Sequence, residues 1–585
     1  MALDGITLAA VKSELSKKLI KGRIDKIYQP QKHLLTIRLR QPGENIKLLI
    51  SANPQEPRIH ITDQEFDNPL QPPTFCMLLR KHIQSGRIKE IKQPDFERIL
   101  EITIQYKNNN GELEDKILVI ELMGRHSNII LLKEDRQILD SIKRITSNMS
   151  RYREILPGKK YLPPPGQDKK NPLTTNQQEF KSVLEEKTGQ PIYKTIMKSY
   201  RGIGPTMATE IAHRSPVNEY DDLTSYAQIE ELWPSFSEIF EKVGTEEFEP
   251  TLILDEAGNF EAYAALELQQ FDDLTKEEFN SINQLLNFYF VNRITRKKIN
   301  NLTRKMENTI EKNKENAYKK YRRVNGQLKG AYNADKYQLK GELITANIYQ
   351  LEKGMKKVKL QNYYSENNEE LTIQLDPELS PAENAQYYFK KYEKAKRSIK
   401  YLKNEVRKAK NEINYLKQVE TNIEQAETLT ELKEIYQELV DEDYIKEQKS
   451  NQNKKDKKLP PLKFKSTEGH DILVGRNNRQ NDKLTKKMAN NQDLWFHVKE
   501  IPGSHVIVRN HTRDEIPEDT ILEAAQIAAF YSKGRESSNV PVDYTQVKHV
   551  NKPKGAKPGM VYYENQTTLY VDPDQELVES LEVTD

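Results

Sequence analysis

The stretch YEKAKRSIKYLKNEVRKAKNEINYL, residues 392–416, decides the architecture of this chain. Its apolar positions recur at alternating steps of three and four: Tyr392, Ala395, Ile399, Leu402, Val406, Ala409, Ile413 and Leu416. This spacing is a heptad seam, which predicts a long helix that packs along another helix. Residues 390–417 also hold 11 Lys or Arg against 3 Glu, so the predicted helix is strongly basic.

A second basic arm lies upstream. Residues 293–323 hold 12 Lys or Arg against 3 Glu and repeat the seam less regularly. Between the arms, residues 356–363 and 371–375 have the pattern of strands and predict a small tip. The simplest arrangement is an antiparallel coiled coil within one chain, and a parallel coil between two copies is the alternative. Forty helical residues span about 60 Å, a length that suits a large partner.

The charge is distributed unevenly along the 585 residues, although the formal net charge is only +3. Residues 219–278 hold 18 acidic and 2 basic residues, and we interpret them as an acidic connecting segment. Two basic arms balanced by acid elsewhere predict that a polyanion lies along the arms. A solvated lysine-rich helix face is the alternative interpretation.

Composition excludes several classes of protein. No apolar run approaches the roughly 18 residues of a membrane span, and the first residues lack the pattern of a signal peptide. The single cysteine, Cys76, excludes an internal disulfide and has the neighbours of a buried helix residue. No P-loop or dinucleotide fingerprint is present. We therefore expect a cytoplasmic protein without a nucleotide cofactor or metal.

The N-terminal region alternates helical and strand patterns and predicts a mixed, mostly antiparallel α+β domain. Helices are expected at 8–19 and 75–82, and strands at 34–39, 47–50, 99–106, 117–122 and 128–132. Two motifs stand at the strand ends, DFER at 95–98 and ELMGRHSN at 121–128. A carboxylate and an arginine beside a glycine turn form either a local salt bridge or a recognition site.

Residues 175–215 have a helical pattern and contain GIGPTMATEI at 202–211. A Gly-x-Gly turn of this kind resembles a helix-hairpin-helix, in which glycines allow backbone amides to approach a phosphate. A short glycine turn without any ligand is the alternative.

The C-terminal region contains GRNNRQND at 475–482, DLWFH at 493–497 and PGSH at 502–505. Arg and Lys bind phosphates, Asn and Gln read base edges, and aromatic rings stack on bases, so the mixture predicts RNA contact. The alternative is a small α/β domain in which Trp495 and Phe496 are core. His497 and His505 with Asp493 are a weaker candidate set of metal ligands.

These C-terminal motifs, with DYT at 543–545 and KPKGAKPG at 552–559, closely resemble the RNA-binding domain of the NFACT family. The bacterial, RqcH-like members of that family are also described as fibronectin-binding protein A-like. The two N-terminal motifs match the family's N-terminal domain, and the resemblance covers essentially the whole chain. It also implies an N-terminal domain similar to that of formamidopyrimidine-DNA glycosylase. The chain begins Met1-Ala2-Leu3-Asp4, so the catalytic Pro-Glu pair of those enzymes is missing.

The resemblance implies a division into seven parts. These are the NFACT N-terminal domain 1–172, a helix-hairpin-helix 173–218, the acidic segment 219–284, the coiled coil 285–445 with its tip 331–380, a basic linker 446–465, the RNA-binding domain 466–571 and an acidic, disordered tail 572–585.

The resemblance further implies a ribosome-associated quality-control factor. Such a protein binds large ribosomal subunits obstructed by peptidyl-tRNA and recruits tRNA, in bacteria alanyl-tRNA. It promotes template-independent alanine tailing of the nascent chain, which marks that chain for degradation, while the ribosome performs peptidyl transfer. A surface adhesin that binds fibronectin is the alternative, and surface labelling of intact cells would distinguish the two.

The resemblance carries over to single residues. The implied tRNA-binding residues are Asp4, Glu97, Arg98, Glu121, Leu122, Met123, Arg125 and His126. The implied rRNA-binding residues are Arg476, Asn477, Asn478, Arg479, Asp493, Trp495, His497 and His505. The chain departs from the family at Glu97, where Asp is usual, so the identity of the selected tRNA stays open.

Overall fold

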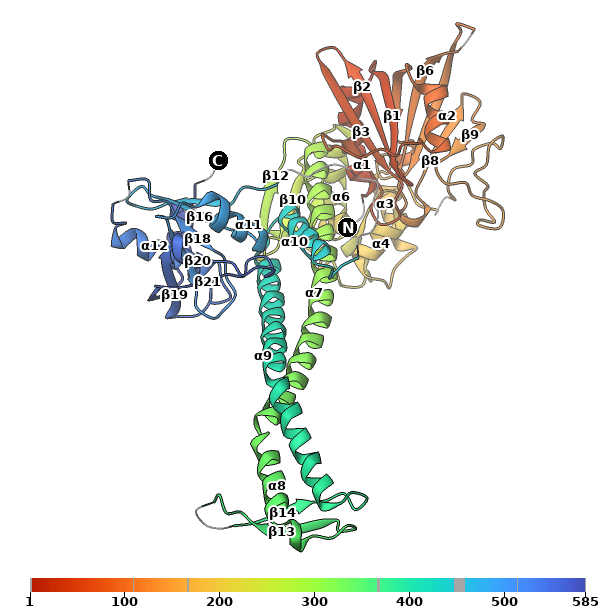
Figure 1. Cartoon of the computed structure of the whole chain (residues 1–585). Coiled ribbons are helices and arrows are strands. Elements are labelled where there is room, and N and C mark those ends of the chain that lie inside the picture. Colours follow the sequence, from red (N-terminus) through yellow and green to blue (C-terminus); the bar gives the residue numbers. More distant parts are fainter. Residues whose placement is uncertain are drawn as a thin grey trace. The chain divides into compact units, whose positions relative to one another are not determined.

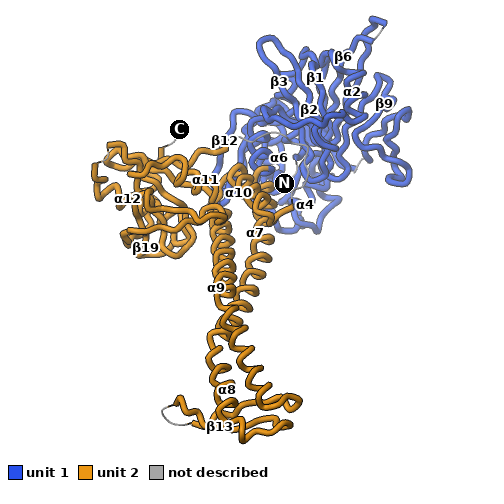
Figure 2. The backbone as a smooth tube through the Cα atoms, viewed as in Figure 1, with its two compact units in different colours: residues 1–294 blue, residues 295–585 orange. Residues whose placement is uncertain are grey.

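The computed structural model describes residues 3–108, 110–165, 168–365, 369–446, 458–512 and 514–583. They form two compact units, residues 1–294 and 295–585 (Figure 2). Most of the predicted basic linker at 446–465 lies outside the described residues.

The first unit is built on a nine-stranded, wholly antiparallel sheet in the order β4-β3-β2-β1-β5-β6-β7-β8-β9 (Figure 1). The mostly antiparallel α+β domain predicted from the sequence is confirmed. The strands are β1 Arg23–Gln31, β2 Leu34–Gln41, β3 Glu44–Ser51, β4 Arg58–Ile61, β5 Arg87–Lys92, β6 Ile99–Lys107, β7 Leu113–Glu121, β8 Asn128–Lys133 and β9 Ile138–Ser141.

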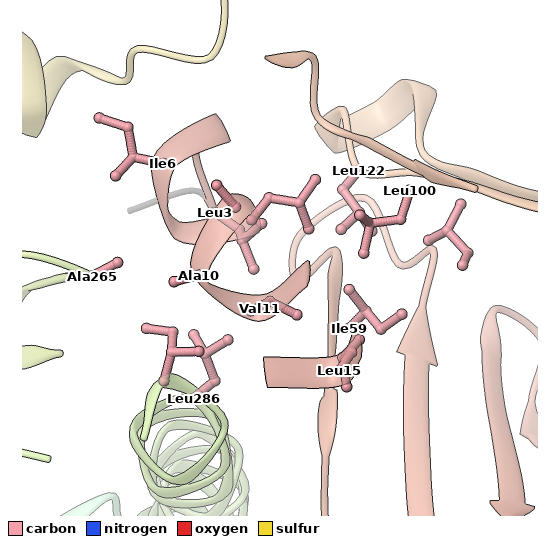
Figure 3. Packing of buried hydrophobic residues seen from close by; sticks show 14 of the residues in the cluster. Leu3, Ile6, Ala10, Val11, Leu15, Ile59, Leu100, Leu122, Ala265 and Leu286 are labelled. Carbon is pink, nitrogen blue, oxygen red and sulfur yellow. The ribbon is translucent and has the colours of Figure 1, made fainter. Parts of the chain in front are cut away.

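Helix α1, Gly5–Leu19, is the centre of this unit's core. Asp4 caps it by accepting a hydrogen bond from the Thr7 amide, which satisfies a backbone donor at the helix start. The helix is apolar on most sides, as expected of a helix enclosed by neighbours rather than lying on a surface. Figure 3 shows its side chains between strand residues such as Ile59 and Leu100 and residues from later in the chain, Ala265 and Leu286. Helix α2, Thr74–Ile83, packs on β1 and buries Cys76, as predicted.

Helices α3 Gln177–Glu185, α4 Ile192–Ser199, α5 Pro205–His213 and α6 Tyr226–Gly244 follow the sheet. An aromatic cluster holds them together: the Phe180, Tyr200 and Phe236 rings have centroids 4.7–5.9 Å apart. Such tilted and stacked contacts add about 0.5–1.5 kcal/mol per pair to the area that they bury.

The interpretation of residues 219–278 as an acidic connector is wrong. They form α6 and a three-stranded sheet of β10 Thr251–Leu254, β11 Phe260–Ala264 and β12 Thr275–Glu278. Leu252, Ile253 and Tyr263 from this sheet are buried in the same core as α1. The acidic side chains occupy the outer positions between these apolar ones, so a high charge count concealed a folded segment.

In the second unit, two long helices run in opposite directions. Helix α7, Ile282–Tyr332, begins in the first unit and continues through the first basic arm, and α9, Pro381–Gln425, contains the second. They contact through Met306, Ile310, Ile413 and Leu416 near one end and through Leu328 and Leu402 further along. Ion pairs join Lys314 to Glu420 and Lys320 to Glu405. The two arms therefore pack against each other within one chain.

The connection between the arms contains a helix that the strand pattern did not reveal, α8 Asp335–Ala346. The hairpin of β13 Lys357–Gln361 and β14 Glu370–Gln374 follows it, at the two predicted strands. After α9, the short helix α10, Leu429–Asp441, folds back and packs on the arms.

The C-terminal domain has a six-stranded sheet in the order β15-β16-β18-β17-β19-β22. Helices α12 Glu518–Phe530 and α13 Gln575–Leu581 cover one face, and α11 Asn478–Lys483 lies beside the smaller core on the other. The tail from 572 was predicted to be disordered, but α13 buries Val578 and Leu581 against α12, which corrects that expectation. The strands are β15 Leu462–Lys465, β16 Asp471–Val474, β17 Leu494–Val498, β18 Val506–Val508, β19 Val540–Gln546 and β22 Thr567–Val571, with a separate pair β20 Val550–Asn551 and β21 Tyr562–Tyr563.

Candidate nucleic-acid interface

Three separate segments meet at one place in the first unit: the start of α1, the loop before β6 and the glycine turn before α5. The Gly5 amide donates to the Gly202 carbonyl over 2.7 Å, and the Gln93 amide group donates to the carbonyls of Gly5 and Glu97. Gly202 has a φ of +70°, and a Cβ added there would lie 2.6 Å from the Phe96 carbonyl oxygen. The Gly-x-Gly turn thus serves close packing inside the chain.

Asp4 is buried at the centre of this junction. Burial raises the pKa of its carboxyl group, while hydrogen bonds from Thr7 and Gly204 and the charge of Arg98 act in the opposite direction. A carboxylate so enclosed has little surface to offer a ligand. The direct tRNA contact expected for Asp4 is therefore corrected to a positioning role, in which it fixes α1 and the glycine turn beside Arg98.

Glu97 and Arg98 stand at the edge of the junction and are both half-buried. Asp95 and Phe96 before them have φ values of 50° and 59°, a left-handed conformation that non-glycine residues rarely adopt. This strained turn sets the direction in which Glu97 and Arg98 leave the backbone, and such strain is common at functional sites. Among the described residues, no carboxylate lies within 4 Å of the Arg98 guanidinium, which leaves that group available to a ligand.

Two basic residues that sequence reasoning missed complete the surroundings of Glu97. Arg201 lies 3.7 Å from the Glu97 carboxylate and 3.4 Å from that of Asp95. Lys169 is close enough to interact electrostatically with both Glu97 and Arg98; burial lowers its pKa and Glu97 partly restores it. Arg201 directly precedes the glycine turn, so the GIG motif was the available signal. Guanidinium and ammonium groups bind phosphate oxygens, and a carboxylate accepts from base amino groups, so this arrangement can hold RNA.

The second motif lies beside the first. The Leu122 amide donates to the Arg98 carbonyl over 2.9 Å, because Ile99 and Glu121 are paired across β6 and β7. Residues Gly124–His126 form a single 3₁₀ turn that exposes Arg125 and His126, whose side chains share a hydrogen bond of 2.9 Å. The structure thus brings Arg98, Arg125 and His126 to the same end of two neighbouring strands.

Glu121 and Leu122 do not belong to the exposed part of this site. Glu121 is fully buried, and its two carboxylate oxygens accept from the Arg153 guanidinium at 2.6 and 2.7 Å and from the Tyr161 hydroxyl at 2.8 Å. Leu122 is 1% exposed and part of the core. The contact with tRNA predicted for both residues is therefore corrected to a supporting role for the turn at 124–126. Glu121 supports that turn by binding Arg153 and Tyr161. Met123 is half-buried and lies in the chain between the buried pair Glu121 and Leu122 and the exposed pair Arg125 and His126.

The C-terminal motif at 475–482 contacts a row of carboxylates on α10, the α10 row: Glu431, Glu434, Glu438 and Asp441. These residues lie on one helix face, at steps of three and four. Arg476 pairs with Glu431 and Arg479 with Asp441. Between them, the side-chain amide of Asn477 donates to Glu434 at 2.8 Å and that of Asn478 to Glu438 at 2.9 Å. Four of the eight residues predicted to bind rRNA, those at 476–479, are thus already bonded within the chain.

The aromatic and histidine residues of the same region are internal. Asp493 and Trp495 are completely buried and His505 is 1% exposed. Trp495 stacks on His497 and meets Tyr563 and His505, so no ring face is open to a base. Burial lowers the pKa of His497 and that of His505, which are therefore neutral near pH 7. The direct RNA contact expected for Asp493, Trp495 and His505 is corrected to structural support of the domain.

Within the described part of the chain, no three His, Cys, Asp or Glu side chains are grouped so that they could hold a metal ion. None of the helices searched among those residues is long and apolar enough to cross a bilayer.

Comparison with known proteins adds a family to this geometry. Residues 4–458 match the model of the NFACT N-terminal and middle domains, and residues 461–565 match that of the NFACT protein RNA binding domain. The chain is 38% identical to the Rqc2 homolog RqcH of Bacillus subtilis (strain 168) over 99% of both chains. It is 36% identical to the Rqc2 homolog RqcH of Streptococcus suis (strain 05ZYH33) over 100% of both.

Among solved structures, the C-terminal part of the fibronectin/fibrinogen-binding protein from Streptococcus suis is similar at 33% identity. It covers 49% of this chain and 99% of its own, with a TM-score of 0.39.

Proposed function

The chain belongs to the NFACT family of ribosome quality-control proteins with an RNA-binding domain, and from this premise we propose its part in the process. It binds large ribosomal subunits obstructed by peptidyl-tRNA, recruits alanyl-tRNA and promotes template-independent addition of C-terminal alanines to the stalled chain. The added alanines mark that chain for degradation. The process takes place in the cytoplasm.

One observation carries the tRNA part of the proposal: Arg98, next to Glu97, has no carboxylate within 4 Å among the described residues. It lies at the strand ends that also expose Arg125 and His126. Arginine binds a phosphate or a guanine edge with two parallel hydrogen bonds, and a glutamate accepts from the amino group of cytosine. A strained turn and the buried Asp4 hold both groups in place, so little conformational entropy is lost when RNA binds.

The long helices support the ribosomal part. The heptad spacing favours a coiled coil, and its outward positions carry the lysines and arginines of both arms. Positive side chains repeated along a helix neutralise the phosphates of structured RNA and release counterions when they bind it. The glycine turn between α4 and α5 fits a helix-hairpin-helix whose role is to support the Arg98 site.

In this proposal the chain contributes position and no catalytic group. The ribosome performs peptidyl transfer, and the chain holds an aminoacylated tRNA where the ribosome can use it. Peptidyl transfer is accelerated because the bound tRNA is held next to the peptidyl-tRNA, which replaces a bimolecular encounter by an effectively unimolecular step.

The test separates tRNA binding from subunit binding. Arg98→Ala should reduce tRNA recovered with the full chain about tenfold to a hundredfold, the loss expected for charge-assisted hydrogen bonds. Co-sedimentation with large subunits should remain at the wild-type level. Arg40→Ala, at an exposed arginine of β2, is the matched control and should change neither quantity. Unchanged tRNA recovery in Arg98→Ala would contradict the assignment.

A further inference from the structure

The bonding of Arg476 and Arg479 to the α10 row raises the question of where the C-terminal domain binds RNA. Arginine and asparagine groups that already bond carboxylates can bind phosphate only after they leave those partners. Lys557 is also occupied, with its ammonium 2.8 Å from Glu442, and Lys552 pairs with Asp482. The basic groups that are free must lie elsewhere on the domain.

A second group of basic side chains follows α11 directly. Lys483 ends that helix, and Lys486 and Lys487 lie on a single π-helical turn, η5, Leu484–Met488. All three are exposed, and no carboxylate of the described residues lies within 4 Å of their ammonium groups. A π turn is a rare conformation that occurs frequently at functional sites. It turns two consecutive lysines outward where α11 would otherwise have continued.

An amide-rich loop lies against this turn. Asn490 and Asn491 are exposed, and the backbone of Asn491 accepts a hydrogen bond from the Lys548 amide. Lys548 belongs to the 3₁₀ turn η6, Val547–His549, and is also exposed. We call these six residues the lysine-amide patch: Lys483, Lys486, Lys487, Asn490, Asn491 and Lys548.

The buried Asp493 organises the patch. One of its carboxylate oxygens accepts a hydrogen bond from the backbone N–H of Asn490 at 2.7 Å, and the other accepts one from the backbone N–H of Asn510 at 2.9 Å. Arg509 pairs with Asp493 at 3.1 Å and also donates to the Met488 carbonyl at the end of η5. The Asp493 carbonyl accepts from Val547 at the start of η6. One enclosed carboxylate thereby ties the lysine turn, the amide loop and η6 together.

We propose that the lysine-amide patch is the face with which the C-terminal domain binds RNA. The inference rests on the proposed function, because it assigns a surface to the RNA contact of that domain. Four ammonium groups bind phosphates, and the two amides bind 2′-hydroxyls or base edges. Because Trp495 and Phe496 are completely buried, their rings do not stack on bases, and the patch binds chiefly the RNA backbone.

The first experiment measures salt dependence with the full chain and a fluorescein-labelled RNA hairpin. Lys486→Gln combined with Lys487→Gln should weaken binding and lower the slope of log K against log salt by about 1.5, nearly one per lost phosphate contact. The matched control is Lys465→Gln with Lys533→Gln, two exposed lysines outside the patch that change the net charge equally. The control should leave the slope within about 0.3 of the wild-type value.

The second experiment locates the contact. Ultraviolet crosslinking of 4-thiouridine RNA to the full chain, followed by mass spectrometry, should yield crosslinked peptides that contain residues 483–491. Crosslinks at 476–480, with an unchanged salt slope in the patch variant, would overturn the assignment and show that RNA displaces the α10 row. In that case wild-type co-sedimentation with large subunits would persist and the proposed function would stand. Loss of wild-type co-sedimentation would instead contradict the proposed function itself.

Discussion

At the scale of single residues, Glu97 and Glu121 lie at the same end of neighbouring strands but in opposite surroundings. Glu97 is half-buried beside Arg201 and Lys169, whereas Glu121 has no exposed surface and three hydrogen bonds. A partly exposed carboxylate at the surface can exchange a cationic partner for a ligand. An enclosed one cannot, because breaking its bonds leaves a buried charge unpaired.

Glu121→Gln should therefore destabilise the protein without acting on RNA directly. Removing one partner of a buried ion pair costs about 3–5 kcal/mol, since Arg153 would be left in the core without its counter-charge. Glu97→Gln should change the free energy of unfolding by less than about 1 kcal/mol, because exposed ion pairs contribute little. Urea unfolding followed by circular dichroism measures both. Equal losses in the two variants would show that Glu121 is not the anchor described above.

Sequence predicted the positions of these residues better than their roles. The predicted strand boundaries placed both motifs at the same end of two strands. The pairing of Ile99 with Glu121 then makes Arg98 and Leu122 neighbours. The partner of Glu121 comes from residues 153–161, a long-range contact that no local pattern encodes. Trp495 likewise stands among polar residues in the sequence and becomes enclosed only when β20 and β21 pack on the sheet.

At the scale of elements, the α10 row binds the C-terminal domain to the helix that packs on the two arms. We call the contacts of Glu431, Glu434, Glu438 and Asp441 with residues 476–479 the clasp. Gln418 of α9 adds a reciprocal contact, because its side-chain amide both donates to and accepts from the backbone of Gly503 at 2.9 Å. Burial raises the pKa of the Glu438 carboxyl group, against hydrogen bonds from Asn478 and Tyr415. Several charge-assisted bonds on one helix face fix an orientation more firmly than a single pair does.

Glu431→Gln combined with Asp441→Asn should loosen this clasp. One pair is largely enclosed and the other is exposed, so the combined loss should be about 2 kcal/mol. Hydrogen exchange of the backbone amides in α10 and α11 should accelerate about thirtyfold, while the sheet core stays protected. The control is Glu393→Gln with Glu424→Gln, on the exposed side of α9, which removes the same two negative charges. Protection in α11 equal to that of the wild type would rule the clasp out.

The contact between α1 and Glu246 predicts that part of the free energy of unfolding is lost in acid. Hydrogen bonds from Ser13 and Lys12 of α1, and one from Lys17, lower the pKa of Glu246 to about 2. A carboxyl group whose folded pKa is depressed stabilises the fold above its unfolded pKa, and that stability is lost as the pH falls toward the folded value. The side chain is 36% exposed, so screening limits the contribution to about 1 kcal/mol.

Glu246→Gln should therefore lose less stability than the wild type between about pH 5 and about pH 2. Urea unfolding across this range measures the difference in the free energy of unfolding, which should be about 1 kcal/mol near neutral pH and should shrink toward zero as the pH falls to about 2. Glu256→Gln, at an exposed glutamate in the turn before β11, should follow the wild type throughout. Parallel curves for all three proteins would contradict the role of Glu246.

Element boundaries followed from periodicity wherever one face of an element is buried. Strands β2, β6 and β8 and helices α1 and α2 lie within a few residues of their predicted positions. Among the helices that the sequence did not predict were α6, α8 and α13, whose charged surfaces masked a narrow apolar stripe. Composition averages over both faces of a helix, whereas folding depends on the inner face alone.

At the scale of the whole molecule, the proposed RNA contacts lie in three places of different character. The Arg98 site is small, strained and preorganised, which suits the recognition of one RNA at a defined contact. The arms carry many repeated cations and suit a long backbone, and the lysine-amide patch is a compact basic surface. The two proposed partners, a tRNA and a large ribosomal subunit, differ greatly in size, and separate surfaces that offer different numbers of phosphate contacts fit that proposal.

We propose that this chain joins tRNA to the large ribosomal subunit. The decisive experiment is crosslinking of the full-length protein to RNA in living cells, followed by sequencing of the bound RNA. We expect recovery of large-subunit rRNA together with a restricted set of tRNAs, and loss of the tRNAs alone in Arg98→Ala. Recovery of random mRNA, without enrichment of tRNA or large-subunit rRNA, would contradict it.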